Sequence, residues 1–276
     1  MPWRFWATAA SPPDDKEQPR QNESSILPIP AETPSKKDTF SFTPFQTVAL
    51  SVVCTGTALG LIRVYKSHLR RIPTVDHLKP NHFRNRSLYG YVTRVGDGDN
   101  FHFFHTPGGK WTGWGWMRAV GKGKELKGKT WHVRLAGIDA PEMAHFGRPE
   151  QPFGKEALEW LKGSVLHKYV RVRPWRRDQY DRVVCTVYKR KWLVGKTDVG
   201  LEMIKRGLAT VYEAKFGSEF GGKKEVYKQA EEEAKRRKIG MWQKPGLLGK
   251  LMGKKESSET PREYKTRMNA QEDAAK

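Results

Sequence analysis

The sequence predicts an α+β protein in which a five-stranded β-barrel carries three packed helices and is preceded by one membrane-spanning helix. Three observations support this fold class: an uncharged stretch near the N-terminus, five short strand-like runs beyond Pro80, and three helical runs among and after the last of them. Short strands with few helices favour a small barrel with helices packed outside it.

Charge is distributed unevenly along the 276 residues. The net charge is +21, but residues 1–38 contain five basic and six acidic side chains, so the positive excess lies after them. Residues 1–38 are also rich in Pro, Ser and Gln, a composition that predicts disorder because it cannot bury enough apolar surface. The basic remainder attracts polyanions, either nucleic acid or an anionic membrane surface, and charge alone does not choose between them.

Residues 45–64 read FQTVALSVVCTGTALGLIRV and predict a transmembrane helix. About 20 helical residues at roughly 1.5 Å each span the hydrocarbon core of a bilayer. The alternative is a buried helix of a soluble protein, but no neighbouring segment is suited to cover it on all sides. Gly56 and Gly60 form a small-xxx-small pair that could pack two such helices into a homodimer. Basic residues after the helix favour a cytosolic or matrix-like side for the C-terminal body.

Alternating apolar residues and turn signals predict the strands. They are expected at residues 87–95, 100–105, 131–138, 169–175 and 182–188. Helices are expected at 154–167, 198–206 and 223–238, where Asp198 is suited to cap the second helix and Gly207 to end it. The barrel and its helices are expected to occupy residues 85–245, and residues 247–276 are expected to form a flexible polar tail.

A tryptophan-rich insertion separates the second and third strands. Residues 106–129 contain Trp111, Trp114 and Trp116 among glycines and lysines. Aromatic rings beside cations can stack unpaired bases. The alternative, which we prefer, is that these rings pack back onto the barrel.

Candidate chemistry concentrates in RLAGIDAPE, residues 134–142. A strand ends there, and Pro141 favours a turn on which Asp139 and Glu142 emerge together. Arg134 lies five residues before Asp139, where we expect its side chain to reach a phosphate rather than a metal. Two further candidates lie outside this segment: Asp99 in GDGDN and Arg182 at the end of DQYDR.

Oxygen donors in this set suit a hard cation such as calcium (Ca²⁺), which tolerates irregular geometry. Asp99 and Asp139 supply two carboxylates, and the Ala140 carbonyl is a plausible third oxygen. So few protein ligands imply weak affinity for the cation, whose coordination water and substrate phosphate would complete.

Cleavage of a phosphodiester also needs an oriented water and stabilisation of the developing charge. Glu142 is the remaining carboxylate and is suited to act as general base or to position the water. Arg134 and Arg182 offer forked donors to phosphate oxygens, a geometry that lysine does not reproduce.

Residues 85–245 resemble the staphylococcal-nuclease (thermonuclease) family. The resemblance rests on DGDN, RLAGIDAPE, FGKEA (153–157), DQYDR, LEMIKRGLA (201–209) and KIGMW (238–242), in that order. It implies an OB-type barrel and calcium-dependent hydrolysis of DNA or RNA with the 5′-oxygen as leaving group. It carries the family's metal ligands onto Asp99, Asp139 and Ala140, its catalytic residues onto Arg134, Glu142 and Arg182, and its phosphate-contacting tyrosine onto Tyr180.

Departures from the family pattern concern three neighbours of the site. Asn100 stands where the family often has Thr, and Gln179 and Asp181 replace a basic residue and a glycine of the bacterial enzyme. The uncharged segment before the domain resembles fungal, membrane-anchored probable endonucleases and implies a mitochondrial location. The alternative function is a non-catalytic, membrane-tethered nucleic-acid-binding module. A membrane scaffold is a third reading, but it explains none of the site residues.

Overall fold

A computed structural model of the chain describes residues 43–145, 147–190, 195–213, 218–243 and 259–274. The chain divides into two units, residues 1–53 and 54–276, and the second contains the barrel. The predicted disordered segment 1–38 lies outside the described residues.

Helix α1 spans Pro44–Val64 and continues as a π-helical turn, Tyr65–Leu69. Its 21 residues extend about 32 Å, close to the thickness of a bilayer core. No residue of α1 is buried. Within the described part of the chain, Pro44–Leu69 is the one helix long and apolar enough to cross a membrane.

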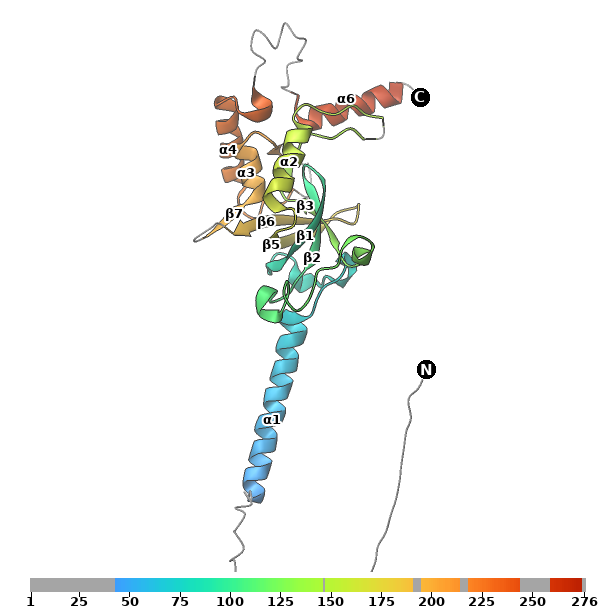
Figure 1. The fold of residues 1–276 in the computed structure, drawn as a ribbon. Coiled ribbons are helices and arrows are strands. Elements are labelled where there is room, and N and C mark those ends of the chain that lie inside the picture. Colours follow the sequence, from blue (N-terminus) through green and yellow to red (C-terminus); the bar gives the residue numbers. More distant parts are fainter. Residues whose placement is uncertain (1–42, 146, 191–194, 214–217, 244–258, 275–276) are drawn as a thin grey trace, which may run out of the picture. The chain divides into compact units, whose positions relative to one another are not determined.

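Five strands close the predicted barrel, shown in Figure 1. Neighbours pair antiparallel in the order β3, β2, β1, β5, β6, and a parallel pairing of β3 with β6 completes the circle. β4 and β8 form a second, two-stranded sheet, and β7 pairs antiparallel with the end of β6. The strands are β1 Leu88–Asp97, β2 Asn100–His105, β3 Trp131–Leu135, β4 Ile138–Asp139, β5 Tyr169–Arg177, β6 Val183–Arg190, β7 Lys196–Asp198 and β8 Thr210–Val211.

Alternation along β3 separates the core from the candidate site. Trp131, Val133 and Leu135 are buried in the barrel interior, each at most 1% exposed. Because successive strand residues point to opposite faces, His132 and Arg134 lie on the other face. The alternation of apolar residues along β3 therefore determines the face of the sheet on which Arg134 lies.

Three helices pack with the barrel, as the sequence predicts: α2 Gly154–Val165, α3 Val199–Lys205 and α4 Lys224–Arg236. Asp198 caps α3, since its side chain accepts a hydrogen bond from the Leu201 amide at 3.3 Å. Gly207 follows α3 with φ of 64°, a left-handed conformation that suits glycine.

The packed domain extends beyond the expected range 85–245 at both ends. Ile72 and Val75 belong to the hydrophobic core. The expected flexible tail instead contains helix α6, Pro261–Ala274, on which Tyr264 is only 3% exposed. Short 3₁₀ turns complete the described elements: Val75–His77, Pro80–His82, Gly109–Thr112, Gly123–Leu126 and Gly240–Trp242.

The tryptophan-rich insertion divides into packed and exposed rings. Trp114 is 6% exposed and meets the ring of Phe104 edge-on at 5.6 Å. Trp111 and Trp116 are 98% and 74% exposed. The preferred prediction of packing is therefore right for Trp114 and wrong for the other two.

Candidate active site

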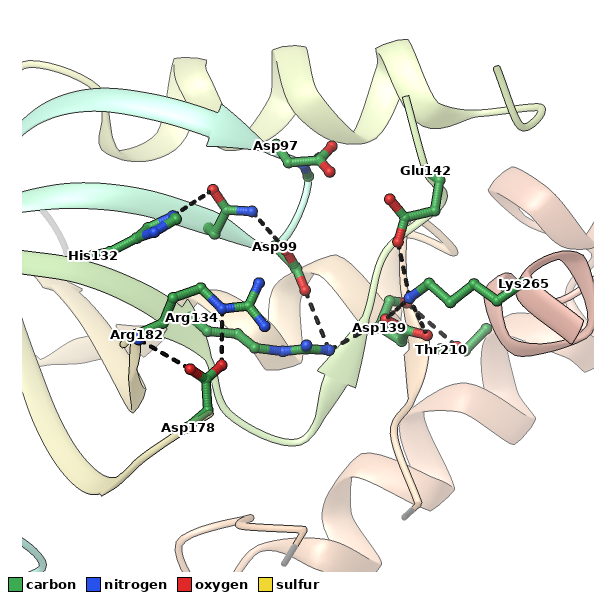
Figure 2. A network of polar contacts seen from close by, with 12 residues as sticks. Asp97, Asp99, His132, Arg134, Asp139, Glu142, Asp178, Arg182, Thr210 and Lys265 are labelled. Carbon is green, nitrogen blue, oxygen red and sulfur yellow. Dashed lines mark hydrogen bonds and ion pairs between the residues drawn. The ribbon is translucent and has the colours of Figure 1, made fainter. Parts of the chain in front are cut away.

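Two carboxylates and one guanidinium from separate elements meet at one end of the barrel (Figure 2). Asp99 lies in the tight turn between β1 and β2, Arg134 on β3 and Asp139 on β4. Nη2 of Arg134 lies 3.3 Å from Oδ2 of Asp99 and 3.3 Å from Oδ1 of Asp139. Closure of the barrel thus brings together three of the residues that the sequence singles out.

The position of Arg134 differs from the expectation that it reaches away from the metal ligands. Its guanidinium contacts both predicted carboxylate ligands and lies 5.1 Å from the ring centre of Tyr212. Burial by itself would lower the pKa of Arg134, but attraction to Asp99 and Asp139 outweighs it and raises the pKa. Arg134 therefore offsets part of the negative charge of the two carboxylates.

Burial affects the acidic groups as well. The Asp139 side chain is 4% exposed, and this burial raises the pKa of its carboxyl against the attraction of Lys265 and Arg134. Burial, together with Asp99 and Glu142, raises the pKa of Asp97 to about 6. Both pKa values are raised mainly by burial, and a bound cation would offset that cost by stabilising the charged carboxylates.

Glu142 stands on the loop after β4, and its backbone is held in place by Gln151. The Glu142 amide donates to Oε1 of Gln151 at 3.2 Å, and the Gln151 amide donates to the Glu142 carbonyl at 2.9 Å. Gln151 is 1% exposed. The Glu142 side chain is 30% exposed, so it faces both solvent and the carboxylates.

Lys265 is a site residue that sequence reasoning missed. Its Nζ lies 2.9 and 3.2 Å from the two carboxylate oxygens of Asp139 and 2.8 Å from Oε1 of Glu142 (Figure 2). Burial would lower the pKa of Lys265, but Asp139 and Glu142 together raise it. The ammonium is thus a cation bridging two of the proposed catalytic and metal-binding carboxylates.

Contacts along one side of α6 hold Lys265 there. The Tyr264 hydroxyl donates to the Pro149 carbonyl, and Arg148 pairs with Glu272 at 2.6 Å. The sequence contains a signal for this helix: Thr260 and Glu263 form a capping box, with the Thr260 amide 2.8 Å from Oε2 of Glu263. Thr-Pro-Arg-Glu is therefore a helix start that could have been recognised.

Arg182 is fixed by an aspartate outside the predicted set. Nε of Arg182 donates to Oδ2 of Asp178 at 2.8 Å, and the Arg182 amide donates to Oδ1 at 2.9 Å. Burial would raise the pKa of Asp178, but its hydrogen bonds with Arg182 lower it. The guanidinium lies 5.1 Å from the ring centre of Tyr180, which is 68% exposed. Asp181 pairs instead with Arg177.

Asn100 provides a further support for the site. Its Nδ2 donates to Oδ1 of Asp99 at 3.1 Å, and its Oδ1 lies 3.1 Å from Nε2 of His132. Burial, followed by the nearby His102, lowers the pKa of His132 to about 4, so the ring is neutral at pH 7 and can donate through Nε2. The unusual Asn100 thus orients Asp99.

Comparisons with known proteins give a consistent result. The staphylococcal nuclease homologue family matches residues 132–244, a range that includes every predicted site residue except Asp99. A protein of Botryotinia fuckeliana named "Probable endonuclease lcl3" is 54% identical, covering 82% of this chain and 83% of its own length. "Probable endonuclease lcl3" of Pyrenophora tritici-repentis is 50% identical, with 94% and 95% covered, and "Probable endonuclease LCL3" of Uncinocarpus reesii is 46% identical, with 99% of each covered.

These relatives share about half of their residues with this chain over nearly all of its length. The barrel with its three helices is the fold that the resemblance implies. The chain therefore belongs to the staphylococcal nuclease homologue family and is a nuclease, a hydrolase of phosphodiester bonds.

Proposed function

We propose that this nuclease is a calcium-dependent endonuclease of DNA or RNA, held at a membrane by α1. The observation that carries the proposal is the convergence of Asp99, Arg134, Asp139 and Glu142 at one end of the barrel. Two carboxylates that contact one nitrogen, beside a third carboxylate, form a site for positive charge. A phosphodiester needs its own negative charge offset there during cleavage.

The residues fit a hard divalent cation. Asp99, Asp139 and the Ala140 carbonyl would hold it through oxygen, and calcium accepts such a set with water and substrate oxygens completing it. Among the described residues no three His, Cys, Asp or Glu side chains are grouped for a metal, so the proposal needs the carbonyl and outside ligands. When bound, calcium would neutralise charge on the phosphoryl oxygens.

The protein's own groups then have separate tasks. The Glu142 carboxylate orients an attacking water and accepts its proton. Arg134 and Arg182 donate to phosphoryl oxygens, which gain charge in the transition state. The hydrogen bond of Arg182 to the Asp178 side chain uses Nε, so its two terminal nitrogens are available to a substrate phosphate and Asp178 keeps the fork oriented. Tyr180 offers its exposed hydroxyl to a substrate phosphate.

The activity test uses the full chain in non-ionic detergent. Cleavage of single- and double-stranded DNA and RNA is measured with added calcium and with a chelator. We expect calcium-dependent cleavage that falls roughly 10²–10³-fold in Arg182→Ala and in Glu142→Gln, about the cost of losing one preorganised catalytic group. Arg236→Ala, on the exposed side of α4, is the matched control. Cleavage that survives chelation would refute the calcium requirement.

Binding without cleavage in the same assay would support the alternative, a non-catalytic nucleic-acid-binding module. In that case Arg182→Ala should weaken binding, whereas the wild type should yield no product at any calcium concentration.

Support for the anchor comes from the length of α1 and from its lack of buried residues. After alkaline extraction of membranes that contain the full chain, we expect the protein in the pellet, and release into the supernatant would contradict a spanning helix. The mitochondrial location follows from the resemblance to fungal anchored members, and co-fractionation with mitochondria tests it.

Dimerisation through α1 is a further part of the proposal. A Cβ atom added at Gly56 or Gly60 would meet no atom within 4 Å, so this face of the helix is open to a second copy. Small residues four apart allow two helices to approach closely in lipid. Gly56→Leu with Gly60→Leu should abolish cross-linked dimers, and dimers that persist would contradict this interface.

A further inference from the structure

A basic groove of about 1020 Å³ lies at the start of β1 and β5 and the end of β6. Its described lining contains no Asp or Glu. Six basic side chains line it: Arg86, Lys110, Arg171, Lys189, Arg190 and Lys196. So many cations without a counter-charge indicate an anionic partner.

The groove is remote from the catalytic residues. Tyr89 lines the groove near the start of β1, whereas Asp99 follows the end of the same strand. Ten residues at about 3.3 Å each separate these ends by roughly 30 Å. The groove therefore needs a ligand other than the phosphate being cleaved.

The chain that follows α1 is fastened to this same end of the barrel. The Ile72 amide donates to Nδ1 of His105 at 3.0 Å, and Nε1 of Trp131 donates to the Ile72 carbonyl at 2.9 Å. Arg86, a groove residue, also contacts Ser67, with Nη2 3.1 Å from the Ser67 hydroxyl. His105 itself lines the groove.

This fastening limits the distance between the groove and the membrane. Residues 65–71 separate the end of α1 from Ile72. Even fully extended, seven residues reach roughly 25 Å, and in helical form about 10 Å. Where α1 spans the bilayer, as proposed above, Ile72 and the end of the barrel that it contacts stay within this distance of the headgroups.

Two exposed aromatic rings border the same end. Trp111 lines the groove and is 98% exposed, and Trp116 is 74% exposed. Nε1 of Trp116 already donates to the Lys110 carbonyl at 2.9 Å, so its ring can enter an apolar layer without an unpaired donor. Tryptophan beside lysine is the composition of membrane–water interfaces.

We propose that this groove and the loop at Trp111 and Trp116 dock on anionic phospholipid headgroups of the membrane that holds α1. The proposal rests on the anchoring proposed above. A single-stranded nucleic acid would suit the same chemistry, but the tether of Ile72 directs the groove toward the bilayer. Each basic residue near an anionic surface strengthens binding roughly fivefold. Docking would hold the catalytic end about one barrel length above the lipid.

The test places the full chain in nanodiscs of phosphatidylcholine, with or without roughly 30% of the anionic lipid phosphatidylserine. Part of each lipid is brominated on its acyl chain, and tryptophan fluorescence is recorded. We expect stronger quenching in the anionic discs, and loss of the additional quenching in Trp111→Phe with Trp116→Phe. Lys110→Glu with Arg171→Glu should lose it too.

A charge-matched control changes exposed lysines outside the groove, Lys124→Glu with Lys127→Glu, and should retain the quenching. Equal quenching in both kinds of disc, or no effect of the groove variants, would overturn the proposal. Loss of oligonucleotide binding instead, in a Glu142→Gln background, would assign the groove to nucleic acid and also overturn it. Cleavage of a short oligonucleotide in the same discs reports the nuclease separately, and alkaline extraction reports the anchor.

Discussion

Replacing Lys265 by methionine is expected to lower the calcium concentration that this nuclease requires. The ammonium lies 2.9 Å from Asp139 and 2.8 Å from Glu142, so it occupies part of the space in which a cation and its waters would approach these carboxylates. Calcium binding must therefore displace Lys265 or work against its charge. Methionine retains the length of the side chain and removes the charge.

The expected magnitude follows from the contacts. A hydrogen bond to a charged group contributes about 1.5–3 kcal/mol, and solvent screening reduces this because the Lys265 side chain is 37% exposed. If Lys265 opposes calcium binding by about 1–3 kcal/mol, its removal changes the apparent affinity for calcium by roughly 5- to 150-fold. We therefore expect the half-saturating calcium concentration to fall by about one order of magnitude, with little change in the rate at saturation.

The assay is a calcium titration of oligonucleotide cleavage by the full chain in detergent. Lys265→Arg keeps the charge and should resemble the wild type, and Lys127→Met removes an exposed lysine elsewhere as a matched control. Tyr264→Ala weakens the packing of α6 by a different route and should shift the titration in the same direction as Lys265→Met.

A reduced rate at saturating calcium with an unchanged midpoint would refute this reasoning, since Lys265 would then assist the reaction. An unchanged titration in both Lys265→Met and Tyr264→Ala would show that α6 does not compete for the site.

Three further predictions concern other residues. Asp178→Asn should release the Arg182 fork and lower kcat roughly tenfold with an unchanged circular dichroism spectrum; an unaffected kcat would contradict the positioning role. Burial lowers the pKa of His105 to about 3, and its neutral Nδ1 accepts the Ile72 amide. Since the unfolded ring binds its proton near pH 6.5, stability should fall as pH drops below about 6.5, by about 3 kcal/mol at pH 4.5. In chemical unfolding His105→Gln should flatten this dependence, and parallel curves for both proteins would refute the assignment. Leu161→Ala, a fully buried change in α2, should reduce the free energy of unfolding by about 2–5 kcal/mol, and a loss below 1 kcal/mol would contradict its place in the core.

Local patterns predict most of the barrel. Val170 and Val172 are buried in β5 and Arg171 between them is exposed, as their alternation indicates. A residue's preference for one face of a strand is local information, and so is the cap of α3 at Asp198. The contiguous segment 134–142 likewise marks the candidate site, because its turn residues and charges are neighbours in the chain.

Pairings between distant residues could not be predicted in this way. Lys265 lies 126 residues from Asp139, and no local period connects α6 with β4. Arg134 contacts Asp99 and Asp139 rather than pointing away from them. This contact depends on the closure of the barrel, which places Nη2 of Arg134 3.3 Å from an oxygen of each carboxylate. The difference between buried Trp114 and exposed Trp111 depends equally on the surface beneath the loop.

Local sequence features predict the five barrel strands, three helices of the domain, the apolar α1 and the set of residues suited to phosphodiester chemistry. Hydrophobic period, turn residues and charge type are properties of neighbouring residues, and each of these features depends on them alone. Contacts between segments distant in the chain place Lys265 in the site and fasten Ile72 beside a basic groove. These depend on which surfaces remain exposed after the core has closed, a property that no single segment of the chain contains.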